Sequence, residues 1–158
     1  MSGFVATAPS PPAADPQDAI ANDGWFPPLS MADTRNAMRL DGTVTPERLR
    51  AALVNAMMDI NRQLRAFKAE RAALGQASLE AASAGELVDG QPRLVLLYLR
   101  AVMCSAKADL VERYRDFDAD GNRSRLEDHE PGADEQRRNA HWAVRDILDQ
   151  SHVFVELI

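Results

Sequence analysis

The sequence has one cysteine, Cys104, three histidines and few aromatic residues, which make up 6% of the chain. One cysteine cannot form an internal disulfide, and it cannot supply the thiolates of a cysteine-based zinc site. No histidine lies one helical turn from another histidine or from the cysteine. The sequence also has no G-x-S-x-G motif and no phosphate-binding glycine loop. These absences predict a protein that is not an enzyme and that needs no cofactor.

Long apolar runs and an excess of positive charge are also missing. No apolar stretch approaches the roughly 20 residues that a membrane-spanning helix needs, and residues 1–16 lack the basic start and apolar stretch of a signal peptide. The formal net charge is −6 and the pI is about 5.0. This acidic balance argues against binding along a phosphate backbone, which needs clustered lysine and arginine. We therefore expect a protein of the cytosol, or one assembled there, without a membrane partner.

The length of 158 residues, 46% of them hydrophobic, fits a single domain. Six of the nine prolines lie within the first 28 residues, and proline removes a backbone donor and fixes φ. We expect a flexible proline-rich arm at 1–24, a helical domain at 25–150 and an extended tail at 151–158.

The domain is expected to be all-α with about four helices, two of them long and central. The patterns place them at about 31–40, 46–74, 92–117 and 134–148, with a possible extra turn around Leu79.

Capping signals and one apolar stripe support these helices. Ser30 is an N-cap candidate, and Thr45-Pro46-Glu47 combines a cap, a proline at the first helical position and an acidic residue. Six apolar residues then recur at gaps of three and four, which places them on one face of a long helix: Leu49, Leu53, Met57, Ile60, Leu64 and Phe67.

The chain closes with a β-rich segment, and no other segment predicts a strand. A lone strand leaves its backbone groups unpaired, so its partner is expected to be another chain. The alternative is a tail that packs across its own helices through Phe154 and Ile158. Trp25 and Phe26 are a second candidate anchor, with the alternative that they cap the end of the helical bundle. The candidate partner-binding residues are Trp25, Phe26, Val153, Phe154, Val155, Leu157 and Ile158.

One acidic segment matches the calcium-loop pattern D-x-D-x-D-G with a glutamate at position 12. Its candidate ligands are Asp116, Asp118, Asp120 and Glu127. Against a calcium site, an arginine occupies position 8, a Pro-Gly pair cuts the exit helix short, and no second loop is present to pair with it. The alternative is a solvated acidic turn.

Several blocks, in order, give the sequence a resemblance to a known family. The blocks are Trp25-Phe26-Pro27, Met38-Arg39-Leu40, Thr43-Val44-Thr45-Pro46-Glu47-Arg48-Leu49-Arg50, Asn61 with Leu64, Tyr98, Arg100-Ala101-Val102, Leu110-Val111-Glu112-Arg113-Tyr114-Arg115 and Trp142-Ala143-Val144-Arg145. Over roughly residues 25 to 158 the chain resembles the head completion proteins of temperate contractile-tailed phages.

The resemblance implies a helical connector of the virion neck, assembled in the host bacterial cytoplasm. Such a protein docks on the portal after DNA packaging as a homo-oligomeric ring of about twelve copies and stabilises the filled head. It also offers a surface to a tail terminator or another neck protein. Double-stranded DNA passes through the channel without specific binding, which suits the acidic charge. The calcium-like pattern is not something that the family needs.

Overall fold

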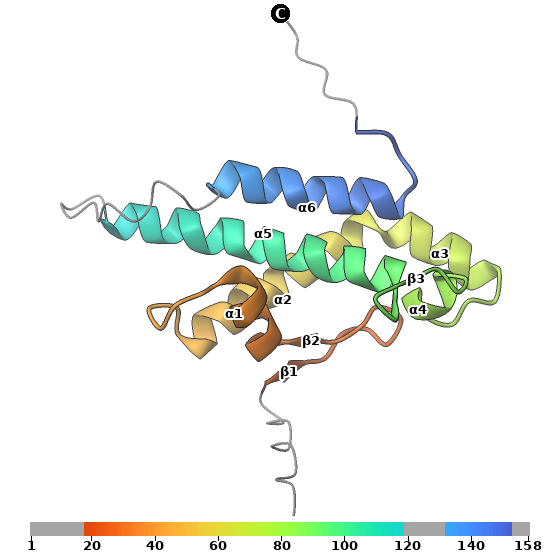
Figure 1. Cartoon of the computed structure of the whole chain (residues 1–158), viewed down its shortest axis with the longest axis horizontal. Helices are drawn as coiled ribbons and strands as arrows, with labels where there is room; N and C mark the ends of the chain where they lie inside the picture. The colour runs from red at the N-terminus through yellow and green to blue at the C-terminus, as the bar shows by residue number, and fades with distance from the viewer. Residues whose placement is uncertain (1–17, 119–131, 153–158) are drawn as a thin grey trace, which may run out of the picture.

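The computed structural model describes residues 18–118 and 132–152, and within them the chain is mostly helical (Figure 1). Six helices and two short antiparallel strand pairs occur in this part of the chain, where four helices were expected. The elements are β1 Ala19–Ile20, β2 Leu29–Ser30, α1 Met31–Met38, α2 Pro46–Gln63, α3 Arg65–Ala73, α4 Leu79–Ala82, β3 Leu87–Val88, β4 Gln91–Pro92, α5 Arg93–Asp118 and α6 Ala133–Ile147.

Helix α5 is the centre of the molecule. Helix α6 runs antiparallel beside it, and α2 crosses it on another side (Figure 1). The start of α5 is apolar nearly all round, and Leu94, Tyr98, Ala101 and Val102 are buried. A helix that is apolar on most sides is buried on most sides, which explains why α2 and α6 both pack against α5.

The predicted apolar stripe is confirmed, because all six of its members are buried. The single helix expected over 46–74 is instead two helices, α2 and α3, separated at Leu64 (φ −90°, ψ 7°). The Leu64 N–H still donates to the Ile60 carbonyl at 3.0 Å, and the Lys68 N–H donates to the Leu64 carbonyl at 2.9 Å. Because the hydrogen bonds continue on both sides, the break is a bend that keeps the stripe on the core.

Two strand pairs correct the expectation that only the C-terminal tail is β-structured. Ile20 pairs with Leu29 in β1–β2, and Leu87 pairs with Pro92 in β3–β4. Each strand has two residues, which is too short to show the alternating pattern by which strands are found in a sequence.

The packed body begins before residue 25, where the helical domain was expected to start. Ile20 is buried, and Asp18 caps α1 together with the predicted N-cap Ser30. The Asp18 carboxylate accepts from the Ser30 hydroxyl at 2.6 Å and from the Ala32 N–H at 2.7 Å, while its carbonyl accepts from the Met31 N–H at 3.0 Å. A carboxylate at a helix N-terminus satisfies free N–H groups, so this capping fixes the end of the arm to the body.

Candidate interaction surfaces

The aromatic pair Trp25 and Phe26 lies in the core. Their rings are T-shaped with centroids 4.8 Å apart, and Phe26 stacks on Tyr98 of α5 at 4.9 Å. Trp25 also meets Phe67 of α3 edge to face, at 6.3 Å. Only 7% of Trp25 and 3% of Phe26 is exposed. This packing is what the alternative in which the pair caps the bundle expects, and little of either ring is exposed. Partner binding by the pair stays a prediction.

A ring of hydrogen bonds joins the N-terminal segment to the two long helices. The Asn22 amide donates to the Tyr98 hydroxyl at 2.8 Å, this hydroxyl donates to the Asn61 carbonyl oxygen at 2.7 Å, and the Asn61 amide donates to the Asn22 carbonyl oxygen at 2.9 Å. Burial raises the pKa of Tyr98, although the hydrogen bond from Asn22 opposes the shift, so the phenol keeps its proton. The hydrogen bonds among Asn22, Asn61 and Tyr98 are therefore kept across the physiological pH range.

Three of the sequence blocks on which the family resemblance rests meet in these aromatic contacts and hydrogen bonds. Trp25 and Phe26 come from the first block, and Asn61 and Tyr98 belong to two others. Asn22 completes the ring and was missed, because an isolated asparagine in an irregular segment carries no sequence signal. These blocks hold the N-terminal segment against α2 and α5.

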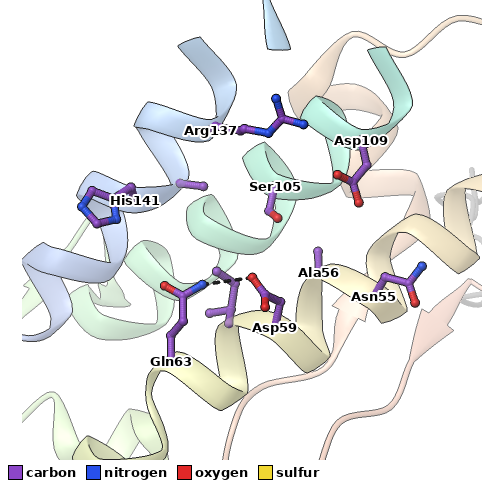
Figure 2. A pocket seen from close by; sticks show the side chains of 10 residues that line it. Asn55, Ala56, Asp59, Gln63, Ser105, Asp109, Arg137 and His141 are labelled. Atoms are coloured by element: carbon purple, nitrogen blue, oxygen red, sulfur yellow. Dashed lines mark hydrogen bonds between the residues drawn. The ribbon is translucent and has the colours of Figure 1, made fainter. Parts of the chain in front are cut away.

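A groove of about 400 Å³ lies between α2, α5 and α6 (Figure 2). Sequence reasoning did not find it, because its lining comes from three helices that are far apart in the chain. Small residues, Ala56 and Ala140, lie among polar ones. The full lining is Asn55, Ala56, Asp59, Ile60, Gln63, Ser105, Asp109, Arg137, Ala140 and His141.

Two charged side chains of the groove, Asp59 and Arg137, already have partners. Asp59 accepts from Gln63 at 3.1 Å and pairs with Arg62. Arg137 pairs with Glu112 and lies 3.6 Å from Asp134. The hydrogen bond to Glu112 raises the pKa of Arg137, and the desolvation that opposes this shift is the weaker effect. Internal pairing leaves these groups with little charge to offer a ligand.

The groove also contains a serine, aspartates and a histidine, the residue types of nucleophilic catalysis. Ser105, Asp109 and His141 make no hydrogen bond with one another in the described chain, whereas an activated nucleophile needs contact with its base. Cys104 is buried, and its burial raises the pKa of the thiol, away from the reactive thiolate. Among the side chains that the structure describes, those of residues 18–113 and 132–152, no group of three potential metal ligands is close enough to hold an ion.

In the part of the chain that the structure describes, five large apolar side chains are exposed. Val54 (38% exposed) and Met58 (60%) lie one turn apart on α2. Leu74 (67%) is exposed at the end of α3, and Leu87 (62%) and Val88 (53%) are exposed in β3. The end of α3 and the β3–β4 hairpin lie at the same end of the molecule (Figure 1). Grouped exposed apolar side chains are typical of protein interfaces.

The remaining predicted sites fall outside the described residues. The α5 backbone continues through Asp116 and Asp118, but the side chains of these two residues, together with Asp120 and Glu127, are not described. The tail 153–158 is likewise outside. Calcium binding and strand addition by the tail both stay predictions. None of the described helices is long and apolar enough to cross a membrane.

Comparison with known proteins gives two matches. The family model described as phage head completion protein (GPL) matches residues 20–158. The chain is also similar to the head completion/stabilization protein of Escherichia phage P2, with 34% identity over 148 residues that cover 93% of this chain and 86% of the relative. No solved structure matches.

Proposed function

The chain belongs to the phage head completion protein family, and from this premise we propose that it joins the portal of the filled head to the neck. Membership makes it a structural component of the virion that acts in head completion, not an enzyme. In the proposal, copies dock as a ring on the portal after DNA packaging and retain the genome. The outer face of the ring then receives a tail terminator or another neck protein.

The observation that carries this proposal is the placement of β1–β2 and the end of α6 on the helical body. The β1–β2 pair lies on one side of α5, and the chain leaves α6 on the opposite side (Figure 1). In the sequence, a proline-rich segment comes before β1, and a β-rich segment comes after α6. A subunit whose described chain ends lie on opposite sides of the helical body can offer the adjoining sequences to two different neighbours, as a protein between portal and tail must do.

The tail Val153–Ile158 has the composition for strand addition to a partner. Valine, phenylalanine and isoleucine favour extended backbone, and a strand added to an exposed sheet edge gains main-chain hydrogen bonds. The residue before the tail is anchored: His152 stacks on Trp142 with centroids 5.3 Å apart, and its Nε2 lies 2.7 Å from the Asp146 carboxylate. This anchor fixes the point at which the tail leaves the helical body.

The net charge of −6 supports a role at a channel that DNA passes through. Phosphate contacts made by clustered lysine and arginine bind DNA strongly, so a ring rich in them would hold the strand. An acidic subunit lets the double helix pass without being held by specific contacts.

The test is the native mass of the portal ring from the same phage, alone and mixed with the full chain. We expect the mass of the portal to rise by one copy of this chain for each portal subunit, which is about twelve in a ring of the usual symmetry. Absence of binding by the folded, full-length chain would contradict the proposal.

A matched pair of variants then tests the tail. Replacing residues 153–158 with six alternating serines and glycines keeps the length and removes the β propensity. The same replacement at residues 4–9 serves as the control. We expect the first variant to keep the circular dichroism of the helical body and to lose most portal binding. Loss of the helical signal would show instead that the tail packs on its own helices.

A further inference from the structure

We propose that His152 is a positioning residue for the tail, which directs residues 153–158 outward over α6 and away from the core of their own subunit. The side chains of His152, Trp142 and Asp146 form what we call the clip. The proposal rests on the proposed function, in which the tail binds a neighbouring protein. A tail that is directed outward stays available to that neighbour.

The chain reverses its direction directly after α6. Asp149 has a positive φ of 53°, and the N–H of Gln150 donates to the Arg145 carbonyl at 2.9 Å, which is the backbone pattern of a helix that ends in a left-handed residue. The reversal brings His152 back beside α6, where it meets the other two members of the clip. The chain therefore runs back over α6 before the tail begins.

The clip lies away from the face of α6 that packs on α5. That face is marked by the buried apolar residues Ala140, Ala143, Val144 and Ile147. At 3.6 residues per turn, Trp142 lies nearly opposite the middle of this face, and Asp146 lies to one side of it. In Figure 1 the chain after α6 likewise runs on the side of α6 that is turned away from α5. The helix thus separates the start of the tail from α5.

Apolar residues of the same subunit lie close enough for the tail to reach. Arg100 donates to Asn139 at 3.5 Å, and α5 and α6 are antiparallel, so the end of α6 lies level with the start of α5. Four apolar side chains at that start are only partly buried: Val95, Leu96, Leu97 and Leu99. Six extended residues span at most about 20 Å, roughly two helix diameters. Without the clip, a tail with five apolar residues in six would fold onto its own α5.

The clip is a surface contact, and its strength suits a choice of direction. The side chain of His152 is 38% exposed and that of Asp146 is 31% exposed. The Arg138 guanidinium lies 5.2 Å from the centroid of the Trp142 ring, so the ring has a second neighbour on α6. An aromatic pair changes an equilibrium constant by about two- to tenfold. Such a preference selects an outward tail without making the helical fold depend on it.

Portal binding by full-length variants tests the role of His152. His152→Ala removes the stack on Trp142, and we expect the dissociation constant for the portal to rise about two- to tenfold. His152→Phe restores a ring at this position and should recover most of the loss. His141→Ala is the control, because it makes the same substitution at an exposed residue of α6 outside the clip, and it should bind as the native chain does. Binding of native strength by His152→Ala would overturn the proposal.

A chain without the tail sequence separates positioning from direct contact. When residues 153–158 are replaced with serines and glycines, His152→Ala should leave the residual portal binding unchanged, because no tail remains to be directed. A further loss in this background would show that His152 touches the partner itself, and it would overturn the role of His152 as a positioning residue.

Digestion of the tail by a carboxypeptidase tests the clip without the portal. A tail held away from the helical body is open to the enzyme, whereas a tail packed on α5 is protected. We expect digestion to be about two- to tenfold slower in His152→Ala than in the native chain, and unchanged in His152→Phe and His141→Ala. An unchanged rate in His152→Ala would overturn the proposal. Slower digestion of His152→Ala, together with no portal binding by the unmodified chain, would overturn the proposed function and leave the role of the clip standing.

Discussion

The two strand pairs of this protein have the same length and opposite surroundings. In β1–β2, the paired Ile20 and Leu29 are 4% and 2% exposed. In β3–β4, Leu87 and Val88 are 62% and 53% exposed. The first pair is part of the core, and the second presents apolar side chains to solvent.

The difference comes from the elements that adjoin each pair along the chain. β2 leads directly into α1, and just before it Phe26 stacks on Tyr98 of α5 and Trp25 packs on Phe67 of α3, so β1–β2 is held against the helices. β3 and β4 are joined by Asp89 and Gly90, both with positive φ (50° and 71°). Backbone hydrogen bonds of Glu86, to Ser83 at 2.9 Å and from Arg93 at 2.8 Å, attach the hairpin to the end of α4 and the start of α5. Pairing alone does not decide burial; the helices beside a strand do. An exposed apolar hairpin is thus free to serve an interface.

The largest expected effect comes from truncating one leucine in each pair. Leu29→Ala should lower the free energy of unfolding by about 2–5 kcal/mol, because it leaves a cavity in the core. Leu87→Ala should change it by less than about 0.5 kcal/mol, because the side chain is already in water. Urea denaturation of both variants measures the difference. Equal losses would mean that the hairpin also belongs to the core.

The hydrogen-bonded ring explains how the first pair is held, and Tyr98→Phe tests it. Removing the hydroxyl leaves the Asn61 carbonyl oxygen without its donor in a partly buried place. We expect a loss of about 1–3 kcal/mol in the free energy of unfolding, measured by urea denaturation.

A double-mutant cycle with Asn61→Ala is the control for that prediction. Because Tyr98 and Asn61 share a hydrogen bond, the double variant should lose less than the sum of the two single losses. Additive losses would show that the two side chains stabilise the fold independently of each other.

The turn of the second pair has a smaller effect on the fold. Gly90 has φ of 71°, and a Cβ built there meets nothing within 4 Å, so Gly90→Ala adds backbone strain alone. We expect a loss of about 1 kcal/mol in the free energy of unfolding. Gly42→Ala is the matched control, because its site is equally open and its φ is not positive. That change should be neutral or slightly stabilising. If urea denaturation gives the two variants equal losses in the free energy of unfolding, the positive φ of Gly90 does not account for the effect.

Whether a feature of this fold could be predicted from the sequence depends on how far apart in the chain its residues lie. The stripe on α2 and α3 repeats over about five turns, and its six members are buried as expected. The extra turn at Leu79 is α4, and the caps at Ser30 and Thr45 accept from the backbone as expected. Long periodic segments and local capping chemistry can be read from a sequence because each depends on residues close together in the chain.

The parts that could not be predicted depend on distant partners. The bend at Leu64 keeps the same hydrogen bonds as a straight helix, so no residue type marks it. Asn22 meets Tyr98 across 76 positions of sequence, and the groove draws its lining from three helices. The sequence left open whether Trp25 and Phe26 face a partner or the core. Their residue types show that they are apolar but do not show what they pack against.

The smallest expected effect concerns pH and the anchoring of the first pair. Burial disfavours the charged form of Asp23, but hydrogen bonds from Lys68 and from the N–H groups of Phe26 and Trp25 outweigh it and lower the pKa below the usual 3.8. A carboxyl whose pKa is lower in the folded state stabilises the fold above the unfolded pKa, and this contribution is lost as the pH falls through the folded one. Lys68 and Asp23 are each about one-third exposed, so solvent screens the pair and the contribution should stay below about 1 kcal/mol.

Asp23→Asn keeps an oxygen that accepts the two N–H groups and removes the charge. The gap in stability between the native chain and this variant should therefore narrow between about pH 6 and pH 3 in urea titrations. Glu70→Gln, at an exposed residue of α3, serves as the control and should show a smaller change. A gap for Asp23→Asn that stays constant over the same range would mean that Asp23 anchors the first pair through its geometry and not through its charge.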